Sequence, residues 1–172
     1  MNSRRALLIG GLSVVATALL PRRAEAVSDA LPMADRVVVV KSERRLYLMR
    51  AGVPFRTFRV WLGLDPKGHK EQEGDFRTPE GEYRLDAKNP QSEYFLSIHV
   101  SYPNRDDQER ARRSHREPGG AIMIHGLPNV PKHSTEYYLR NDWTNGCIAL
   151  TNDDMLEVWL LTRVDTPIEI RP

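Results

Sequence analysis

The sequence has almost no cysteine and no long apolar segment. Only one of its 172 residues is a cysteine, so no disulfide can form within the chain. Its longest apolar run, residues 6–20, is about 15 residues long, and a membrane-spanning helix needs about 20. The sequence also has no repeat and no Gly-Pro-Ser-rich tract, which excludes solenoids, collagen-like chains and linkers. The length and composition that remain are those of one globular domain.

The sequence also has little net charge once the N-terminal segment is set aside. The whole chain has a formal net charge of +2. Residues 1–26 hold four arginines against one glutamate, a sum of +3, which leaves about −1 for the rest. Nucleic-acid binding depends on an excess of lysine and arginine that neutralises phosphates. We therefore do not expect nucleic acid as a partner of this nearly neutral domain.

Several common catalytic motifs are missing as well. The sequence has no Gly-x-Ser-x-Gly elbow, no Walker A loop, no His-Glu-x-x-His and no Cys-x-x-Cys. The histidines do not stand at metal-ligand spacing, so we expect neither a metal site nor another cofactor. They are His69, His99, His115, His125 and His133.

Residues 1–26 have the pattern of an export signal. Arg4 and Arg5 precede the apolar run, and Ala24-Glu25-Ala26 is a small-x-small cleavage site. The paired arginines resemble a twin-arginine signal. We therefore expect export to the periplasm and cleavage after Ala26, which leaves residues 27–172 as one domain without a stable membrane span. An uncleaved membrane anchor is the alternative.

The rest of the chain predicts many short strands and few helices. The order of elements lacks regular βαβ alternation, so we expect a mainly β, mostly antiparallel sandwich or barrel with short helical insertions. Asn152 is the expected N-cap of an amphipathic helix over 153–162, and 134–139 predicts a short helix. The charged segment 106–115 is read as a helix or a loop. Alternating or β-branched residues predict strands within 36–62 and at 82–85, 94–100, 121–125, 147–150 and 166–170.

The lone cysteine lies in a segment that suits a nucleophile, Thr144-Asn145-Gly146-Cys147-Ile148. Gly146 lets the backbone approach a substrate carbonyl, and the amides of residues 146 and 147 can point at a developing oxyanion. A thiol needs a base or a cation to ionise near neutral pH. His125 is the expected base because it ends an apolar strand and precedes Gly126, and His99 is the alternative. Taken alone, each of these residues is also compatible with a purely structural role.

Ile124-His125-Gly126 followed by residues 144–148 resembles the active-site signature of the L,D-transpeptidase (YkuD) catalytic domain family. The resemblance spans about residues 36–171, nearly the whole chain after the leader. Eighteen residues separate His125 from Thr144, a longer loop than is usual in the family, and Asn145 and Ala149 replace a histidine and an arginine that many members carry. Further matching segments are His69-Lys70, Glu73-Gly74-Asp75, Thr78-Pro79-Glu80-Gly81, Ser101-Tyr102-Pro103-Asn104 and Asp142-Trp143-Thr144.

The resemblance implies a β-sandwich-like enzyme that acts on peptidoglycan stem peptides and needs no metal or other cofactor. Cys147 would attack the L-centre carbonyl of diaminopimelate, release the terminal D-alanine and form a thioester, which an amine acceptor then resolves. His125 would act as general base and acid, oriented by a backbone carbonyl near Gly126. The oxyanion and substrate contacts would come from Thr144, Asn145, Gly146 and the Cys147 amide.

Three other functions stay open at this point. Water in place of the amine would give an L,D-carboxypeptidase, or an amidase that releases a protein attached to the cell wall. A non-catalytic peptidoglycan-binding module is the second alternative. The third is a thiol redox protein, which with one cysteine would work through mixed disulfides.

The loop between the two expected reacting residues also predicts a function. Residues 127–143 hold Pro128, Pro131, Tyr137, Tyr138 and Trp143, and loops of this length are often functional. We expect its aromatic residues to wall one side of the cleft and to control which acceptor enters. The alternative is that they are core residues of a short helix.

Overall fold

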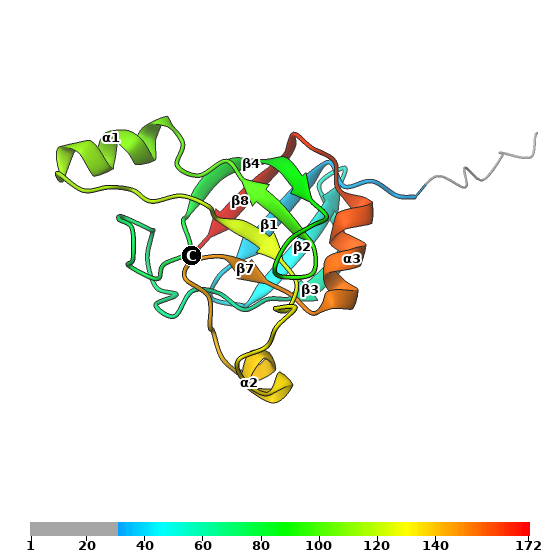
Figure 1. Ribbon diagram of the computed structural model, residues 1–172. Coiled ribbons are helices and arrows are strands. Elements are labelled where there is room, and N and C mark those ends of the chain that lie inside the picture. Colours follow the sequence, from blue (N-terminus) through cyan, green and yellow to red (C-terminus); the bar gives the residue numbers. More distant parts are fainter. Residues whose placement is uncertain (1–30) are drawn as a thin grey trace, which may run out of the picture. The chain divides into compact units, whose positions relative to one another are not determined.

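A single eight-stranded sheet dominates residues 31–172, the part of the chain that the computed structural model describes (Figure 1). The sheet order is β3-β2-β1-β8-β4-β5-β6-β7. The predicted leader, residues 1–26, lies outside the described residues. The strands are β1 (Arg36–Val40), β2 (Arg45–Arg50), β3 (Val53–Arg59), β4 (Gly81–Asn89), β5 (Ser97–Val100), β6 (Met123–His125), β7 (Ile148–Ala149) and β8 (Thr166–Arg171).

The sheet curls until its two ends meet. Most neighbouring strands are antiparallel, as the sequence predicts, but β1 and β8 are parallel, and so are β6 and β7. Just after β3, the backbone of Trp61 exchanges two hydrogen bonds with Ala149 of β7, at 3.0 and 2.8 Å. These bonds join the first and last strands of the sheet order and satisfy backbone groups that an open edge would leave unpaired. The predicted mainly β, barrel-like class is confirmed.

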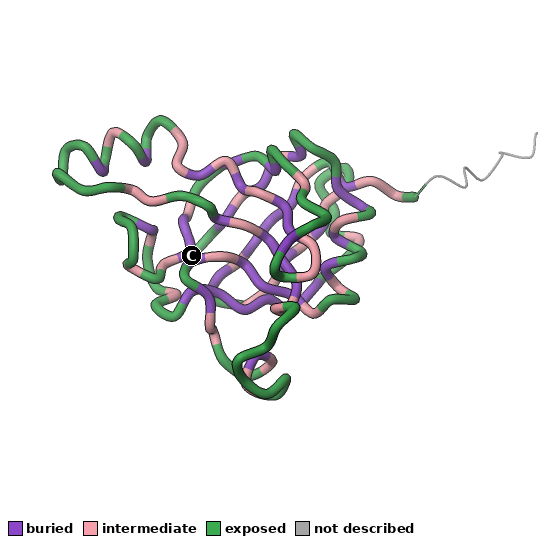
Figure 2. The backbone as a smooth tube through the Cα atoms, in the orientation of Figure 1, coloured by how far each residue is buried: buried purple, intermediate pink, exposed green. Residues whose placement is uncertain are grey.

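Apolar side chains that alternate along the strands fill the inside of the curled sheet. Val37 and Val39 of β1 and Leu46 and Leu48 of β2 are fully buried, and Figure 2 shows the buried positions following the sheet. Burial of one such aliphatic side chain contributes about 1.5–3 kcal/mol. The strands that carry the lone cysteine and His125 therefore rest on a packed core.

The helices are short, as predicted, but one cap differs from the prediction. Thr151, not Asn152, caps α3 (Asn152–Leu161): its backbone is extended and its hydroxyl accepts the Asp154 N–H at 3.2 Å. The Asn152 Oδ1 instead accepts the Leu127 N–H at 2.9 Å, so it ties the start of α3 to the chain just after His125. Within residues 31–172, no helix has the length and apolar character needed to cross a membrane.

Two arms project from the sheet before and after β6 (Figure 1). The α1 arm, residues 101–121, holds α1 (Arg105–Arg113) and is rich in arginine. Asn104 and Asp107 form a capping box at the start of α1. The α2 arm, residues 127–143, holds α2 (Thr135–Arg140) and is rich in aromatic residues.

Candidate active site

The register of β6 and β7 places His125 and Cys147 on one face of the sheet. Ile124 pairs with Ile148 and His125 with Ala149, so Cys147 lies beside Met123. Side chains alternate between faces along a strand, and Ile124 and Ile148 fill the core. His125 and Cys147 therefore share the opposite face as diagonal neighbours. Both line one cavity of about 360 Å³, together with Tyr94, Gly120, Ala121, Ile122, Met123, Trp143, Thr144 and Asn145.

His125 is only 3% exposed, and its orientation is determined by the backbone. Its Nδ1 lies 2.7 Å from the carbonyl oxygen of Gly126. Because a carbonyl only accepts, Nδ1 carries the proton and Nε2 keeps a free lone pair. Burial lowers the pKa of His125 to about 4, although the Gly126 carbonyl acts in the opposite direction. The imidazole is therefore neutral near pH 7 and able to take a proton.

Two aromatic rings pack against the imidazole of His125. Its centroid lies 4.6 Å from that of Tyr94 and 5.5 Å from that of Trp143. Tyr94 reaches this position because the chain turns at Phe95, which has a φ of +61°. The sequence predicts a strand from Tyr94 to Val100, but β5 begins only at Ser97, after that turn. The rings supply much of the apolar environment that keeps His125 uncharged.

Cys147 is half-buried, and its thiol is protonated at rest. The Sγ atom donates a weak hydrogen bond to the Ala121 carbonyl oxygen at 3.5 Å. Burial raises the pKa of the Cys147 thiol, while the Met123 N–H and the positive charge of Lys70 act in the opposite direction. Both reacting side chains are thus neutral before substrate arrives.

The turn before Cys147 corrects one expectation about the oxyanion. The Gly146 N–H is donated to Thr144 Oγ1 at 3.1 Å, so it is not free to bind a developing oxyanion. The Thr144 hydroxyl in turn donates to the Cys147 carbonyl at 2.7 Å, and this buried side chain shapes the turn. The Cys147 N–H has no acceptor among residues 31–172, which leaves it as the available donor of the expected pair.

Two glycines of the signature, Gly146 and Gly126, make close packing contacts. Gly146 has a φ of +127°, and a Cβ there would lie 2.6 Å from the Arg77 carbonyl oxygen. A Cβ on Gly126 would lie 2.7 Å from Asn152 Oδ1. Neither glycine lines the cavity, whereas Thr144 and the exposed Asn145 do. Gly146 thus lets the turn pack closely on Arg77, and Gly126 contributes the carbonyl that orients His125.

The turn before Cys147, residues 142–146, is anchored by an ion pair that the sequence does not reveal. Asp142 accepts hydrogen bonds from Arg44 Nε at 3.0 Å and Nη2 at 2.8 Å, and also from the Leu62 N–H at 2.8 Å. Arg44 lies in the turn between β1 and β2, far from Asp142 along the chain. The backbone N–H groups of Trp143 and Thr144 then donate to the Leu62 carbonyl. The segment that leads to Cys147 is therefore bound to the closing edge of the sheet.

The segment around Lys70 forms a tight loop against the same turn. The buried Lys70 ammonium binds Asp75 Oδ1 at 2.7 Å and the Gln72 carbonyl at 3.0 Å. The Asp75 carboxylate also accepts the Arg77 N–H at 3.1 Å, and despite its burial these partners keep its pKa below the ordinary value. The loop thereby sets the position of the Arg77 carbonyl that Gly146 meets.

The other histidines lie outside the Cys147 cavity. His99 binds Asp86 Oδ1 through Nδ1 at 2.6 Å and sits on β5, two strands away from β7. His69 contacts the backbone of Glu80 and the carboxylate of Asp107, and His133 is exposed on the α2 arm. No group of three or more His, Cys, Asp or Glu residues suited to a metal ion occurs in the described part of the chain.

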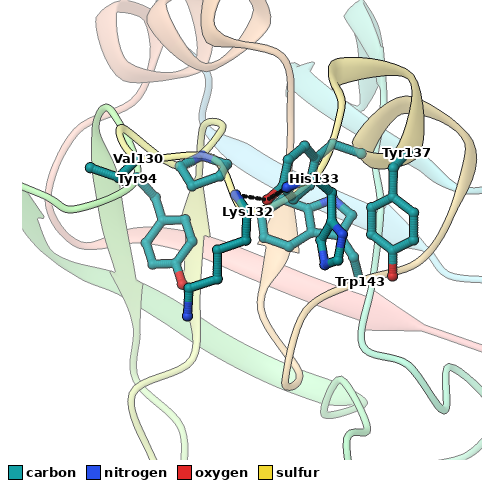
Figure 3. A pocket seen from close by; sticks show the side chains of 8 residues that line it. Tyr94, Val130, Lys132, His133, Tyr137 and Trp143 are labelled. Carbon is teal, nitrogen blue, oxygen red and sulfur yellow. Dashed lines mark hydrogen bonds between the residues drawn. The ribbon is translucent and has the colours of Figure 1, made fainter.

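The α2 arm forms a second cavity, of about 200 Å³, next to the first (Figure 3). Tyr94 and Trp143 line both cavities. The buried Tyr138 packs its ring 4.9 Å from that of Trp143. Of the arm's aromatic residues, only Trp143 lines the Cys147 cavity, whereas Tyr137 and Tyr138 line the second cavity and Tyr138 also forms the arm's own small core. The remaining lining residues are Pro128, Val130, Lys132, His133 and Tyr137.

Comparison with known proteins agrees with this geometry. The sequence pattern of the YkuD family, described as the L,D-transpeptidase catalytic domain, matches residues 34–170. A relative from Escherichia coli strain K12, named as the L,D-transpeptidase YafK, is 31% identical over 129 residues. These residues are 72% of this chain and 45% of YafK. This chain thus aligns with less than half the length of that relative.

Solved structures share the fold. The helical cell shape determining protein Pgp2 of Campylobacter jejuni is 27% identical with a TM-score of 0.58, over 78% of this chain and 46% of Pgp2. An L,D-transpeptidase of Mycobacterium smegmatis is 15% identical with a TM-score of 0.54, over 80% of this chain and 58% of that one. At this lower identity the likeness shows the fold alone.

Proposed function

The chain belongs to the L,D-transpeptidase catalytic domain family, and from that premise we propose that it is a cysteine-dependent acyl transferase acting on peptidoglycan stem peptides. The observation that carries the proposal is the pairing of β6 with β7. It sets a half-buried thiol and a neutral, backbone-oriented imidazole on one face of the sheet, in one cavity. Nucleophilic catalysis by a thiol requires this pairing of nucleophile and base.

In the first half-reaction the thiol displaces the terminal residue of a stem peptide. His125 Nε2 takes the Cys147 proton while the sulfur forms a bond to the carbonyl carbon. The negative charge that develops on the carbonyl oxygen is stabilised by the free Cys147 N–H. The carbon–nitrogen bond then breaks, and His125 returns the proton to the leaving amine. A thioester between Cys147 and the L-centre of diaminopimelate remains.

In the second half-reaction an amine resolves the thioester. The neutral amine attacks the carbonyl carbon, His125 takes a proton from its nitrogen, and the carbon–sulfur bond breaks. The proton returns to the Cys147 sulfur, which restores the resting enzyme. One amide bond replaces another, so the exchange needs no added energy source. The acceptor is the side-chain amine of a second stem or of a protein attached to the cell wall.

Hydrolysis of the same thioester is the second candidate, because the site is open to water. Cys147 is half-buried and the neighbouring Asn145 is exposed. Water that reaches the thioester would give a carboxypeptidase, or an amidase that releases an attached protein. The two outcomes depend on which acceptor reaches the thioester first.

The substrate class agrees with the expected location of the protein. Peptidoglycan lies outside the cytoplasmic membrane, and residues 1–26 have the composition of an export signal with paired arginines. We therefore assign the protein to the periplasm by a twin-arginine route, with a role in cell-wall building and cell shape.

Purified protein incubated with disaccharide-tetrapeptide tests the function directly. Mass spectrometry should show loss of D-alanine together with a cross-linked dimer if the enzyme is a transpeptidase. Loss of D-alanine without the dimer would identify a carboxypeptidase. An unchanged tetrapeptide would contradict both candidates, provided that the protein is folded and its thiol is reduced.

A further inference from the structure

The cavity of the α2 arm has a chemistry that the Cys147 cavity lacks. Its walls combine aromatic rings with the side chains of Lys132 and His133, and no carboxylate lines it. Figure 3 shows Tyr94 and Lys132 on one flank of the cavity and His133, Tyr137 and Trp143 on the other. A small cavity of this kind suits one amino-acid residue that has an aliphatic body and a negatively charged end.

Lys132 is the charge that this cavity leaves uncompensated. Elsewhere on the arm, Arg140 and Glu136 neutralise each other in an ion pair of 2.9 Å. In contrast, the Lys132 ammonium has no hydrogen bond or ion pair within residues 31–172. Its three N–H donors are therefore available to an anionic ligand.

The backbone of Lys132 is nevertheless held in place. The Tyr138 hydroxyl accepts the Lys132 N–H at 2.9 Å and the His133 N–H at 3.2 Å. The His133 ring packs 4.3 Å from that of Tyr137. One buried tyrosine thus fixes the turn from which the side chains of Lys132 and His133 enter the cavity, so less order must be gained when a ligand binds.

The second cavity also lies on the leaving-group side of the reaction. His125 must return a proton to the departing amine, so the departing residue lies on its side of Cys147. The rings that pack on His125 are those of Tyr94 and Trp143, and the same two rings line the second cavity. A residue that leaves the carbonyl carbon on the side of His125 therefore enters the space beside Lys132.

We propose that the α2-arm cavity is the subsite for the residue that follows the scissile bond, and that Lys132 binds the free carboxylate of that residue. The inference rests on the proposed function and adds a specificity to it. The enzyme prefers donors whose leaving residue is the chain end, and it disfavours donors whose terminal carboxylate is amidated or extended. Lys132 is then a specificity-determining residue, separate from the residues that make and break bonds.

Equilibrium binding to protein with Cys147→Ala tests the inference without turnover. The probes are the tetrapeptide L-Ala-γ-D-Glu-diaminopimelate-D-Ala and the same peptide ending in D-alaninamide, both measured by calorimetry. The free acid should bind about tenfold more tightly than the amide, which is the size of one charge-assisted hydrogen bond. Adding Lys132→Met should remove that difference by weakening the free acid alone, and Lys132→Arg should keep most of it.

Lys67→Met is the matched control, because Lys67 is an exposed lysine that lines neither cavity of the site. It should keep the full preference for the free acid. Equal binding of acid and amide to the Cys147→Ala protein overturns the subsite and leaves the proposed function standing, as does an unchanged preference after Lys132→Met. If neither peptide binds, the substrate of the proposed function is wrong, and the inference fails with it.

Discussion

The strands that carry the reacting side chains and the arm beside them are held by different contacts. Cys147 and His125 stand on paired strands whose opposite face, Ile124 and Ile148, is fully buried, and the Trp61–Ala149 bonds close the sheet beside them. The two ends of the α2 arm are tied to the domain through Asn129 and Asp142, but its tip, residues 131–136, is exposed and is held by aromatic contacts and the Tyr138 hydroxyl. The proposed chemistry therefore lies on the part of the domain with the most buried contacts, and the proposed substrate choice lies on an exposed loop that is easier to vary.

Removal of the nucleophile should give the largest effect and should leave the sheet intact. Cys147→Ser should abolish turnover of the tetrapeptide, because a hydroxyl at this position does not ionise readily. The thermal midpoint should change little, since serine fits the volume of a half-buried cysteine. Product analysis and a melting curve check both statements. A variant that retains turnover would remove Cys147 from the mechanism.

Loss of the base should come next in size. His125→Ala should lower the rate by about 10²–10⁴-fold, which is the contribution of a positioned general base. His99→Ala is the matched control, because His99 lies on the same sheet but binds Asp86 outside the cavity. Steady-state kinetics of both variants decide between the two histidines. A larger loss for His99→Ala would show that the base is misassigned.

The burial of His125 should also make the strands sensitive to acid. The pKa of His125 is lowered from about 6.5 in the unfolded chain to about 4 in the folded one. Between these values the unfolded state binds more protons, so the free energy of unfolding falls as the pH falls from about 6.5 to 4. The loss attributable to this residue is on the order of 3 kcal/mol.

Denaturant unfolding at several pH values measures that dependence. His125→Gln is the comparison, because glutamine can still donate to the Gly126 carbonyl but does not titrate. The variant should lose less stability than the wild type between pH 6.5 and 4. Parallel curves for the two proteins would mean that His125 is not buried in its neutral form.

The anchor of the turn before Cys147 should show a smaller effect on stability. Asp142→Asn removes the charge that Arg44 binds and weakens the bond to the Leu62 N–H, so unfolding should be easier by about 1–3 kcal/mol. Glu157→Gln breaks the exposed pair with Arg56 and should cost less than about 1 kcal/mol. Denaturant midpoints compare them. Equal losses would show that Asp142 does not hold the turn.

The arm should give the smallest effect on the chemistry itself. Tyr137→Ala enlarges the second cavity, which is the proposed subsite for the leaving residue, so the rate of Cys147 acylation should fall by only a few-fold, far less than after loss of the base. Leu160→Ala, on an exposed position of α3, is the control. If acylation slows as much as it does in His125→Ala, the arm belongs to the chemistry, and the distinction between strands and arm fails.

The local sequence pattern was sufficient to predict the parts of the candidate site that lie on strands. The alternation around residues 121–125 and 147–150 predicts two strands, and it leaves His125 and Cys147 at positions where a side chain can reach a cleft. The long loop with its aromatic residues was recognisable as a neighbour of the site, and Trp143 is the one of them that lines the Cys147 cavity. The helices over 134–139 and 153–162 were also predictable, although the cap of the second is Thr151 and not Asn152, and the pattern of 106–115 is compatible with either a helix or a loop.

Contacts between distant segments could not be predicted in the same way. The Arg77 carbonyl explains why position 146 must be glycine, but nothing near Gly146 in the sequence points to Arg77. The Arg44–Asp142 pair joins two turns that only the closed sheet brings together. Thr151 and Asn152 are both good caps, and only the contact with Leu127 decides between them. Each of these features depends on how the sheet curls, which short-range pattern does not encode.

The most direct test of the central claim is the intact mass of the protein after brief reaction with disaccharide-tetrapeptide and an acid quench. The account predicts one added acyl group on Cys147, which hydroxylamine removes as expected of a thioester, and no adduct on Cys147→Ala. D-Alanine should appear in the same amount as the acylated protein. Release of D-alanine by Cys147→Ala at the wild-type rate would contradict the account.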